Sequence, residues 1–130
     1  MEKSGIKVLV VDDEDDYRQL MVFWLQSKGY NALPASSGEA AVELVKEENP
    51  DIIFMDLRMP VMDGPKTIAR IREFNADVPI IIISAYLDDS KIREATIAPG
   101  IAGVFYKGKD FSQSLILLES ALRTHKRLKK

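Results

Sequence analysis

Short apolar runs alternate with segments of helical periodicity along the chain, and this alternation constrains the fold more than any other feature. All but one of the runs are continuously apolar, which is typical of parallel strands buried on both faces of a sheet. The run at residues 30–35 is weaker, but it has the length of a strand. We therefore expect five strands, at residues 6–11, 30–35, 52–55, 78–83 and 103–106.

The segments between these runs place apolar residues three and four positions apart, as amphipathic helices do. Ser36 is followed three residues later by Glu39, a capping-box signal, and Pro65 suits a first helical turn. We expect helices at about 14–28, 36–48, 65–74, 88–98 and 111–126. Such alternation predicts one α/β domain, a doubly wound five-stranded parallel sheet with helices on both faces. We expect the strand order 2-1-3-4-5, in which the first, third, fourth and fifth strands are neighbours.

The charge of the chain is unevenly distributed. The net charge is −2, but five basic residues and no acid fall in residues 123–130, which leaves 13 basic and 20 acidic residues, or −7, in residues 1–122. The negative charge of residues 1–122 disfavours direct binding of nucleic acid by this segment. We expect residues 1–122 to form the domain. The tail is then the solvated end of the last helix or the start of a linker, and its basic residues are Arg123, Lys126, Arg127, Lys129 and Lys130.

The chain contains no Cys, which removes disulfides and thiolate chemistry. Its longest apolar runs are too short to span a membrane, and residues 1–5 lack the apolar core of a signal peptide. We therefore expect a cytoplasmic protein without membrane contact.

Polar side chains stand where four of the expected strands end. Asp12 and Asp13 follow the first strand, Asp56 the third, Ser84 the fourth and Lys107 the fifth. In an open parallel sheet all C-terminal strand ends share one edge, and ligands bind there where the strand order reverses. Neighbouring strands lie about 4.8 Å apart, so these side chains are expected to converge within roughly 15 Å.

The chemistry of this set points to phosphoryl transfer. Three close carboxylates repel one another unless a cation compensates, and oxygen ligands without a nearby His suit Mg²⁺. Lys107 and Ser84 offer a charge and a hydroxyl to phosphoryl oxygens, and a carboxylate beside them is equipped to form an aspartyl phosphate. Taken singly, Asp56 or Ser84 could instead cap a turn, and Lys107 could be a solvated charge. Asp15 and Asp16 are expected only to favour a helix start.

Five segments stand out by their spacing: Val10–Glu14, Met55–Pro60, Met62–Gly64, Ser84-Ala85 and Lys107. Together they resemble the receiver domain of the bacterial response-regulator family, over Lys7 to Leu122. The resemblance implies a conformational signalling switch in which Asp56 accepts a phosphoryl group from a histidine kinase or a histidine phosphotransfer protein. Ser84 and Lys107 would contact the phosphoryl oxygens. The domain would act as a catalyst only on its own phosphorylation and dephosphorylation.

The resemblance also implies the metal ligands. Asp13 and Asp56 would ligate Mg²⁺, Asp12 would act mostly through water, and the backbone carbonyl of Arg58 would be a further ligand. The family commonly dimerises through the face made by the fourth helix, fifth strand and fifth helix, so a homodimer through that face is an expectation as well.

Three positions depart from the family pattern. Gly108 replaces the usual proline after the lysine, and we expect a trans bond or local strain there, because a cis bond without proline costs about 2.5–4 kcal/mol. Val104 replaces the switch aromatic, which excludes the coupled ring rotation at this position and leaves Tyr106 or Tyr86 as candidate substitutes. Arg58 places a long cation beside the site, where it could influence phosphoryl lifetime or kinase choice.

Two alternatives use the same topology. A pseudo-receiver would serve only for protein–protein contact; Gly108 and Val104 leave room for it, although the set of acids, Ser and Lys is complete. A flavodoxin-like redox protein needs a phosphate-binding loop after the first strand, where the five acids of residues 12–16 would repel a flavin phosphate. The phosphorylatable receiver is therefore the leading hypothesis.

Overall fold

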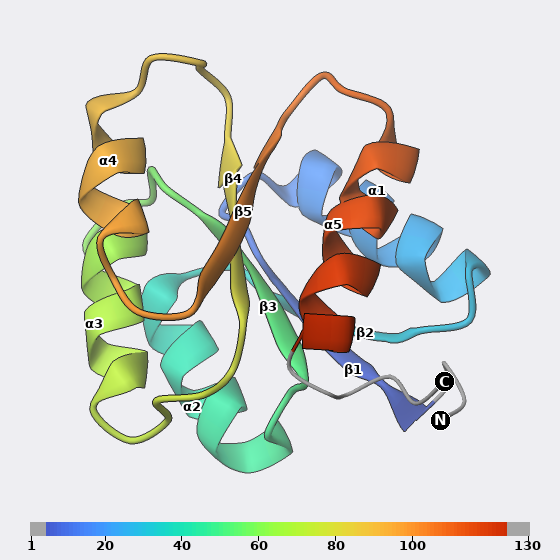
Figure 1. The fold of residues 1–130 in the computed structure, drawn as a ribbon, viewed down its shortest axis with the longest axis horizontal. Coiled ribbons are helices and arrows are strands. Elements are labelled where there is room, and N and C mark those ends of the chain that lie inside the picture. Colours follow the sequence, from blue (N-terminus) through green and yellow to red (C-terminus); the bar gives the residue numbers. More distant parts are fainter. Residues whose placement is uncertain (1–4, 125–130) are drawn as a thin grey trace.

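A computed structural model describes residues 5–124 and shows a five-stranded parallel sheet of order β2-β1-β3-β4-β5 (Figure 1). The expected fold class and strand order are confirmed. The strands are β1 (Lys7–Val11), β2 (Asn31–Ala35), β3 (Ile52–Asp56), β4 (Ile80–Ser84) and β5 (Ile101–Tyr106). The helices are α1 (Asp15–Ser27), α2 (Gly38–Glu48), α3 (Gly64–Arg72), α4 (Ser90–Thr96) and α5 (Phe111–Thr124).

The helices cover both faces of the sheet, with α1 and α5 on one side and α2, α3 and α4 on the other (Figure 1). Successive side chains of a strand point to opposite faces. Val8 and Val10 of β1 therefore pack in the cluster with α1 and α5, whereas Leu9 and Val11 pack with α2 and α3. Because both faces are buried, the strands are apolar throughout rather than alternating.

The edge strand β2 explains the weak second run in the sequence. It pairs only with β1, and Pro34 lies within it opposite Val10. Proline lacks an amide proton, so within sheets it is tolerated at an edge rather than in a central strand. The central strands β3 and β4, by contrast, are buried at every residue.

The helix starts differ in detail from the sequence pattern. The capping box expected at Ser36 and Glu39 is wrong, because Ser37 is the N-cap of α2 and its side chain accepts a hydrogen bond from Ala40 N at 3.1 Å. The fourth helix is also shorter than expected and ends at Thr96. The last helix is described to Thr124, so its expected end at residue 126 and most of the basic tail lie outside the described residues.

Gly64 joins the end of β3 to the start of α3. A Cβ on this residue would lie 2.5 Å from the Asp56 carbonyl oxygen and 2.8 Å from Leu57 Cα, so only glycine allows so close a contact. Its amide donates to the Leu57 carbonyl at 2.8 Å, which holds the loop of residues 57–63 over the end of β3.

Within residues 5–124, none of the helices has the length and hydrophobicity needed to cross a membrane.

Candidate functional site

Three carboxylates meet at the C-terminal edge of the sheet. Asp12 and Asp13 follow β1, Asp56 ends β3, and one oxygen of each lies within 4.8 Å of the others. The strand order places β1 beside β3, which is why residues 44 positions apart in the chain become neighbours. The structure thus brings together the acids that the sequence singled out.

Asp12 is the most deeply enclosed of the three, with no exposed surface. Its Oδ1 accepts a hydrogen bond from Glu14 N at 2.9 Å, and its backbone amide donates to Ala35 O in β2 at 3.1 Å. Its Oδ2 lies 2.9 Å from Lys107 Nζ and is paired with that ammonium. Asp13, by contrast, is exposed.

The ammonium of Lys107 is the cation among these carboxylates. Its Nζ lies 2.8 Å from Glu14 Oε1, 2.9 Å from Asp12 Oδ2 and 3.9 Å from Asp56 Oδ2. It also lies 4.8 Å from the centre of the Tyr17 ring, at cation–π distance. Although burial disfavours the charged form, the contacts with Glu14 and Asp12 raise the pKa of Lys107 above its ordinary value. Lys107 is therefore charged, and its hydrogen bond goes to Glu14 rather than to Asp56.

Ser84 ends β4 beside Asp56 and Lys107, but its hydroxyl is engaged elsewhere. Its Oγ donates to the Tyr86 carbonyl at 2.8 Å and accepts from the Tyr86 amide at 3.2 Å. The Ser84 carbonyl accepts from the Lys107 amide at 2.8 Å, which holds the ends of β4 and β5 together. The serine is therefore in place at the site, with its hydroxyl bonded to the following loop.

One cavity of about 180 Å³ lies at this edge of the sheet, and the fully buried Asp12 is not part of its lining. Asp56, Ser84 and Lys107 form one part of its wall, and Arg58 and Asp89 form another. Its lining also includes the exposed acids Asp13 and Glu14, together with Leu57, Ala85 and Tyr86. The volume is that of a few water molecules, so the cavity has room for a phosphoryl group and a hydrated cation but not for a flavin.

The electrostatics of the cavity act most strongly on Asp56. Burial and the charge of Asp12 together raise the pKa of its carboxyl to about 8, although the charge of Lys107 opposes the rise. A single ammonium does not compensate three acids, so the site favours a further cation. The donors are hard oxygens, and Asp12, Asp13 and Asp56 each place one of them within 4.8 Å of the others. The residues present therefore fit Mg²⁺.

Three residues of the site had no assigned role in the sequence. The sequence pattern predicts only helix positions for Glu14 and Tyr17 and a helix start for Asp89. In the structure Glu14 and Tyr17 contact Lys107, and Asp89 binds the side chain of Arg58. Burial raises the pKa of the Tyr17 hydroxyl, which has no hydrogen-bond partner. No local signal separates these residues from ordinary helix positions, because each acts on a residue far away in the chain.

The departures from the family pattern are resolved in part. No peptide bond among the described residues is cis, so the expected trans bond before Gly108 is confirmed, and Gly108 itself has a φ of 92°. Val104 packs at the margin of the core cluster on the α3 and α4 side. In the loop after Asp56, Val61 has a φ of 70° and is 89% exposed. That conformation is unusual for a β-branched residue, so this loop carries backbone strain.

Comparisons with known proteins agree with this geometry. The family model described as "response regulator receiver domain" matches residues 8–118. The transcriptional regulatory protein ZraR of Escherichia coli K12 is 35% identical over 126 residues, covering 96% of this chain and 28% of that protein. The autoinducer 1 sensor kinase/phosphatase LuxN of Vibrio campbellii is 43% identical over 77 residues, covering 59% of this chain and 9% of LuxN. The receiver domain of Francisella response regulator 1452 superposes with a TM-score of 0.80 at 28% identity, covering 96% of this chain and all of that domain.

Proposed function

Because this chain belongs to the family of response regulator receiver domains of two-component systems, we propose that it is a phosphorylation switch in which Asp56 accepts a phosphoryl group in a Mg²⁺-dependent reaction. The observation that carries the proposal is the convergence of three carboxylates, a charged lysine and a serine at one edge of the sheet, beside one small cavity. That set matches the needs of an aspartyl phosphate, which forms from a carboxylate nucleophile and is highly charged.

In the proposed reaction an oxygen of Asp56 attacks the phosphorus of a phosphohistidine. The new O–P bond forms as the P–N bond breaks, and the electron pair of the broken bond stays on the departing imidazole nitrogen. Lys107 stabilises the negative charge on the phosphoryl oxygens, and the Ser84 hydroxyl donates to one of them after it leaves the Tyr86 carbonyl. Asp12, Asp13, Asp56 and the Arg58 carbonyl would hold Mg²⁺, which supplies charge neutralisation on the transferring group.

The raised pKa of Asp56 has a consequence for this reaction. A protonated carboxyl is a poor nucleophile, so a cation at the site is needed to keep Asp56 ionised near neutral pH. The same cation offsets the repulsion that an incoming phosphoryl group meets from Asp12 and Asp13. The proposed Mg²⁺ dependence thus follows from the carboxylates themselves.

The test is intact-mass spectrometry after incubation with acetyl phosphate and Mg²⁺. The wild type is expected to gain one phosphoryl group of about 80 Da, and Asp56→Asn is expected to gain none because it lacks the acceptor. Asp88→Asn is the matched control, since Asp88 is an exposed acid in the loop before α4 and does not line the cavity. Omission of Mg²⁺ should abolish the wild-type adduct. If no adduct forms on the wild type, the proposal fails and the chain is a receiver fold used for protein contact alone.

We also propose that the phosphoryl donor is a histidine kinase or a histidine phosphotransfer protein, and that residues 1–122 are the receiver domain, with residues 123–130 a basic tail or linker. A similar segment occurs within LuxN, which is named a sensor kinase/phosphatase. The chain spans about a quarter of ZraR, so any output of a longer protein lies outside the segment compared. The acidic domain itself is proposed not to bind nucleic acid.

A homodimer is proposed through the face made by α4, β5 and α5. Ile97, at the end of α4, is 81% exposed and Ile116 on α5 is 67% exposed, and a groove of about 580 Å³ runs beside Ile116 along β5. Exposed apolar side chains of this kind favour association.

In sedimentation velocity, Ile116→Asp is expected to lower the dimer fraction severalfold. Phe23→Asp on α1, where Phe23 is 69% exposed, is the matched control. Equal sedimentation of the wild type and Ile116→Asp would contradict this interface.

A further inference from the structure

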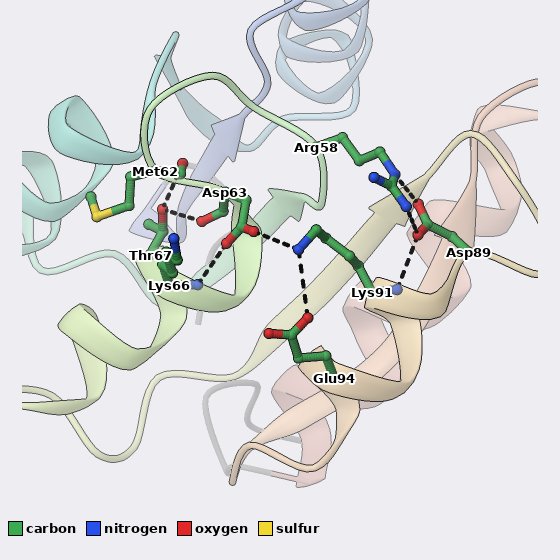
Figure 2. Close-up of polar contacts among 8 residues, drawn as sticks. All are labelled: Arg58, Met62, Asp63, Lys66, Thr67, Asp89, Lys91 and Glu94. Atoms are coloured by element: carbon green, nitrogen blue, oxygen red, sulfur yellow. Dashed lines mark hydrogen bonds and ion pairs between the residues drawn. The ribbon is translucent and has the colours of Figure 1, made fainter.

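Two ion pairs join the loop after β3 to the start of α4 (Figure 2). In the first, Arg58 Nε and Nη2 donate to the two carboxylate oxygens of Asp89, at 2.8 and 2.6 Å. In the second, Lys91 Nζ lies 2.8 Å from Asp63 Oδ2. We call these four residues the clasp. Since 31 residues separate Arg58 from Asp89, the clasp connects segments that the sheet alone does not join.

Both acids of the clasp also cap a helix. Asp63 is the N-cap of α3 and accepts from Lys66 N at 3.0 Å, and Asp89 is the N-cap of α4 and accepts from Lys91 N at 3.0 Å. Each cap is thus bound to a cation from the other segment (Figure 2). Such capping stabilises a helix start, so loosening the clasp loosens the first turn of α4.

The Arg58–Asp89 pair is the stronger half. It is bidentate and charge-assisted, and the Asp89 side chain is only 2% exposed. The hydrogen bond from Arg58 lowers the pKa of the Asp89 carboxyl, so the pair remains charged in neutral solution. The Arg58 side chain is 55% exposed and reaches Asp89 from the solvent side. Its guanidinium can therefore leave without disturbing the core.

The helix that the clasp holds has little else to fix it. The helix α4 has seven residues, and Ala95 is the only one of them that is buried. A helix this short has almost no stability of its own in water. Its position therefore depends on its few packing contacts and on the clasp.

The clasp also borders the site. Arg58 and Asp89 line the same cavity as Asp56, Ser84 and Lys107. A phosphoryl group bound there brings close to two negative charges and three acceptor oxygens, which a guanidinium can bind in the same bidentate way as a carboxylate. Asp89 and the phosphoryl group are consequently alternative partners for Arg58.

We propose that the Arg58–Asp89 pair reports the phosphorylation of Asp56 to α4. In the unphosphorylated protein the pair is closed and holds the first turn of α4. When Asp56 is phosphorylated, Arg58 turns to the phosphoryl oxygens and Asp89 loses its partner, so the start of α4 loosens. The Lys91–Asp63 pair does not line the cavity and stays closed as a tether. This inference rests on the proposed phosphorylation of Asp56.

Hydrogen–deuterium exchange of residues 86–96 tests the inference, measured with Mg²⁺ alone and with Mg²⁺ plus acetyl phosphate. In the wild type, phosphorylation is expected to speed exchange about tenfold, because opening the clasp costs less once Arg58 has another partner. Arg58→Ala should exchange about tenfold faster already with Mg²⁺ alone, and phosphorylation should add nothing further. Lys91→Met should exchange faster than the wild type with Mg²⁺ alone, but phosphorylation should still speed its exchange as much as it does in the wild type. Arg93→Ala is the matched control, an exposed cation of α4 outside the clasp, and should behave as the wild type does.

Intact mass is recorded on the same samples, and exchange rates are compared at equal phosphorylated fractions. An adduct on the wild type with unchanged exchange would overturn the clasp mechanism and leave the proposed function standing. If phosphorylation sped the exchange of Arg58→Ala as much as that of the wild type, the mechanism would also be overturned, because Arg58 would then not be the group that changes partner. Absence of an adduct on the wild type would overturn the proposed function and this inference together.

Discussion

In metal-free solution the free energy of unfolding is expected to fall by about 2–4 kcal/mol between pH 4 and pH 8, because the carboxyl of Asp56 is costly to ionise in the folded state. Its pKa rises from 3.8 to about 8 through burial and the charge of Asp12. Below pH 4 the carboxyl is protonated in both states and costs nothing. Between pH 4 and 8 the unfolded chain releases the proton while the folded chain keeps it, so stability falls as pH rises. Above pH 8 the whole cost is present.

Urea unfolding followed by circular dichroism, at pH 5, 6, 7 and 8, measures this decline. Asp56→Asn is expected to flatten it and to be more stable than the wild type at pH 8, since the amide carries no charge. Millimolar Mg²⁺ should stabilise the wild type at pH 8 and the Asn variant far less. Asp88→Asn serves as the control for the loss of an exposed acid. A wild-type profile that is flat without Mg²⁺ would show that Asp56 ionises freely in the fold.

Lys107→Met is expected to destabilise the metal-free protein by about 3 kcal/mol at pH 8, the size of effect seen when one partner of a buried ion pair is removed. The Asp12 carboxylate is fully buried and 2.9 Å from the ammonium, so its charge would remain without a counter-charge. Methionine keeps an unbranched apolar stem of similar length, which limits the loss of packing. Phosphorylation by acetyl phosphate should slow at least about 100-fold, because the cation that stabilises the phosphoryl oxygens is gone.

The urea midpoint at pH 8 and the rate of adduct formation measure the two effects separately. Lys109→Met is the matched control, an exposed lysine two residues away. The double variant Lys107→Met with Asp12→Asn should recover much of the stability but none of the rate, since it removes the unpaired charge without restoring the cation. Unchanged stability in the single variant would mean that Lys107 contributes no net pairing energy to Asp12.

The sequence was sufficient for the sheet and for the composition of the site. Parallel strands buried on both faces need continuous apolar runs, so their number and approximate positions could be predicted from those runs, whereas the strand order was a separate expectation. Once the strands are parallel, their last residues must share an edge, which is why Asp56, Ser84 and Lys107 were predicted to converge. Both predictions are confirmed in the structure. The capping box failed because Ser36 and Ser37 are adjacent candidates, and a shift of one residue changes which of them caps the helix.

By itself, then, the sequence determined which groups gather at the edge of the sheet. The apolar runs mark the strands, and the residues that end parallel strands meet at one edge. Only the tertiary structure decided which partner each of those groups holds. Lys107 bonds to Glu14 across 93 residues, and Arg58 bonds to Asp89 across 31. Long charged side chains have many rotamers and several candidate partners, so their pairing depends on distances of a few ångströms between separate loops. Those distances depend on how the helices pack on the sheet, and local sequence patterns do not predict that packing.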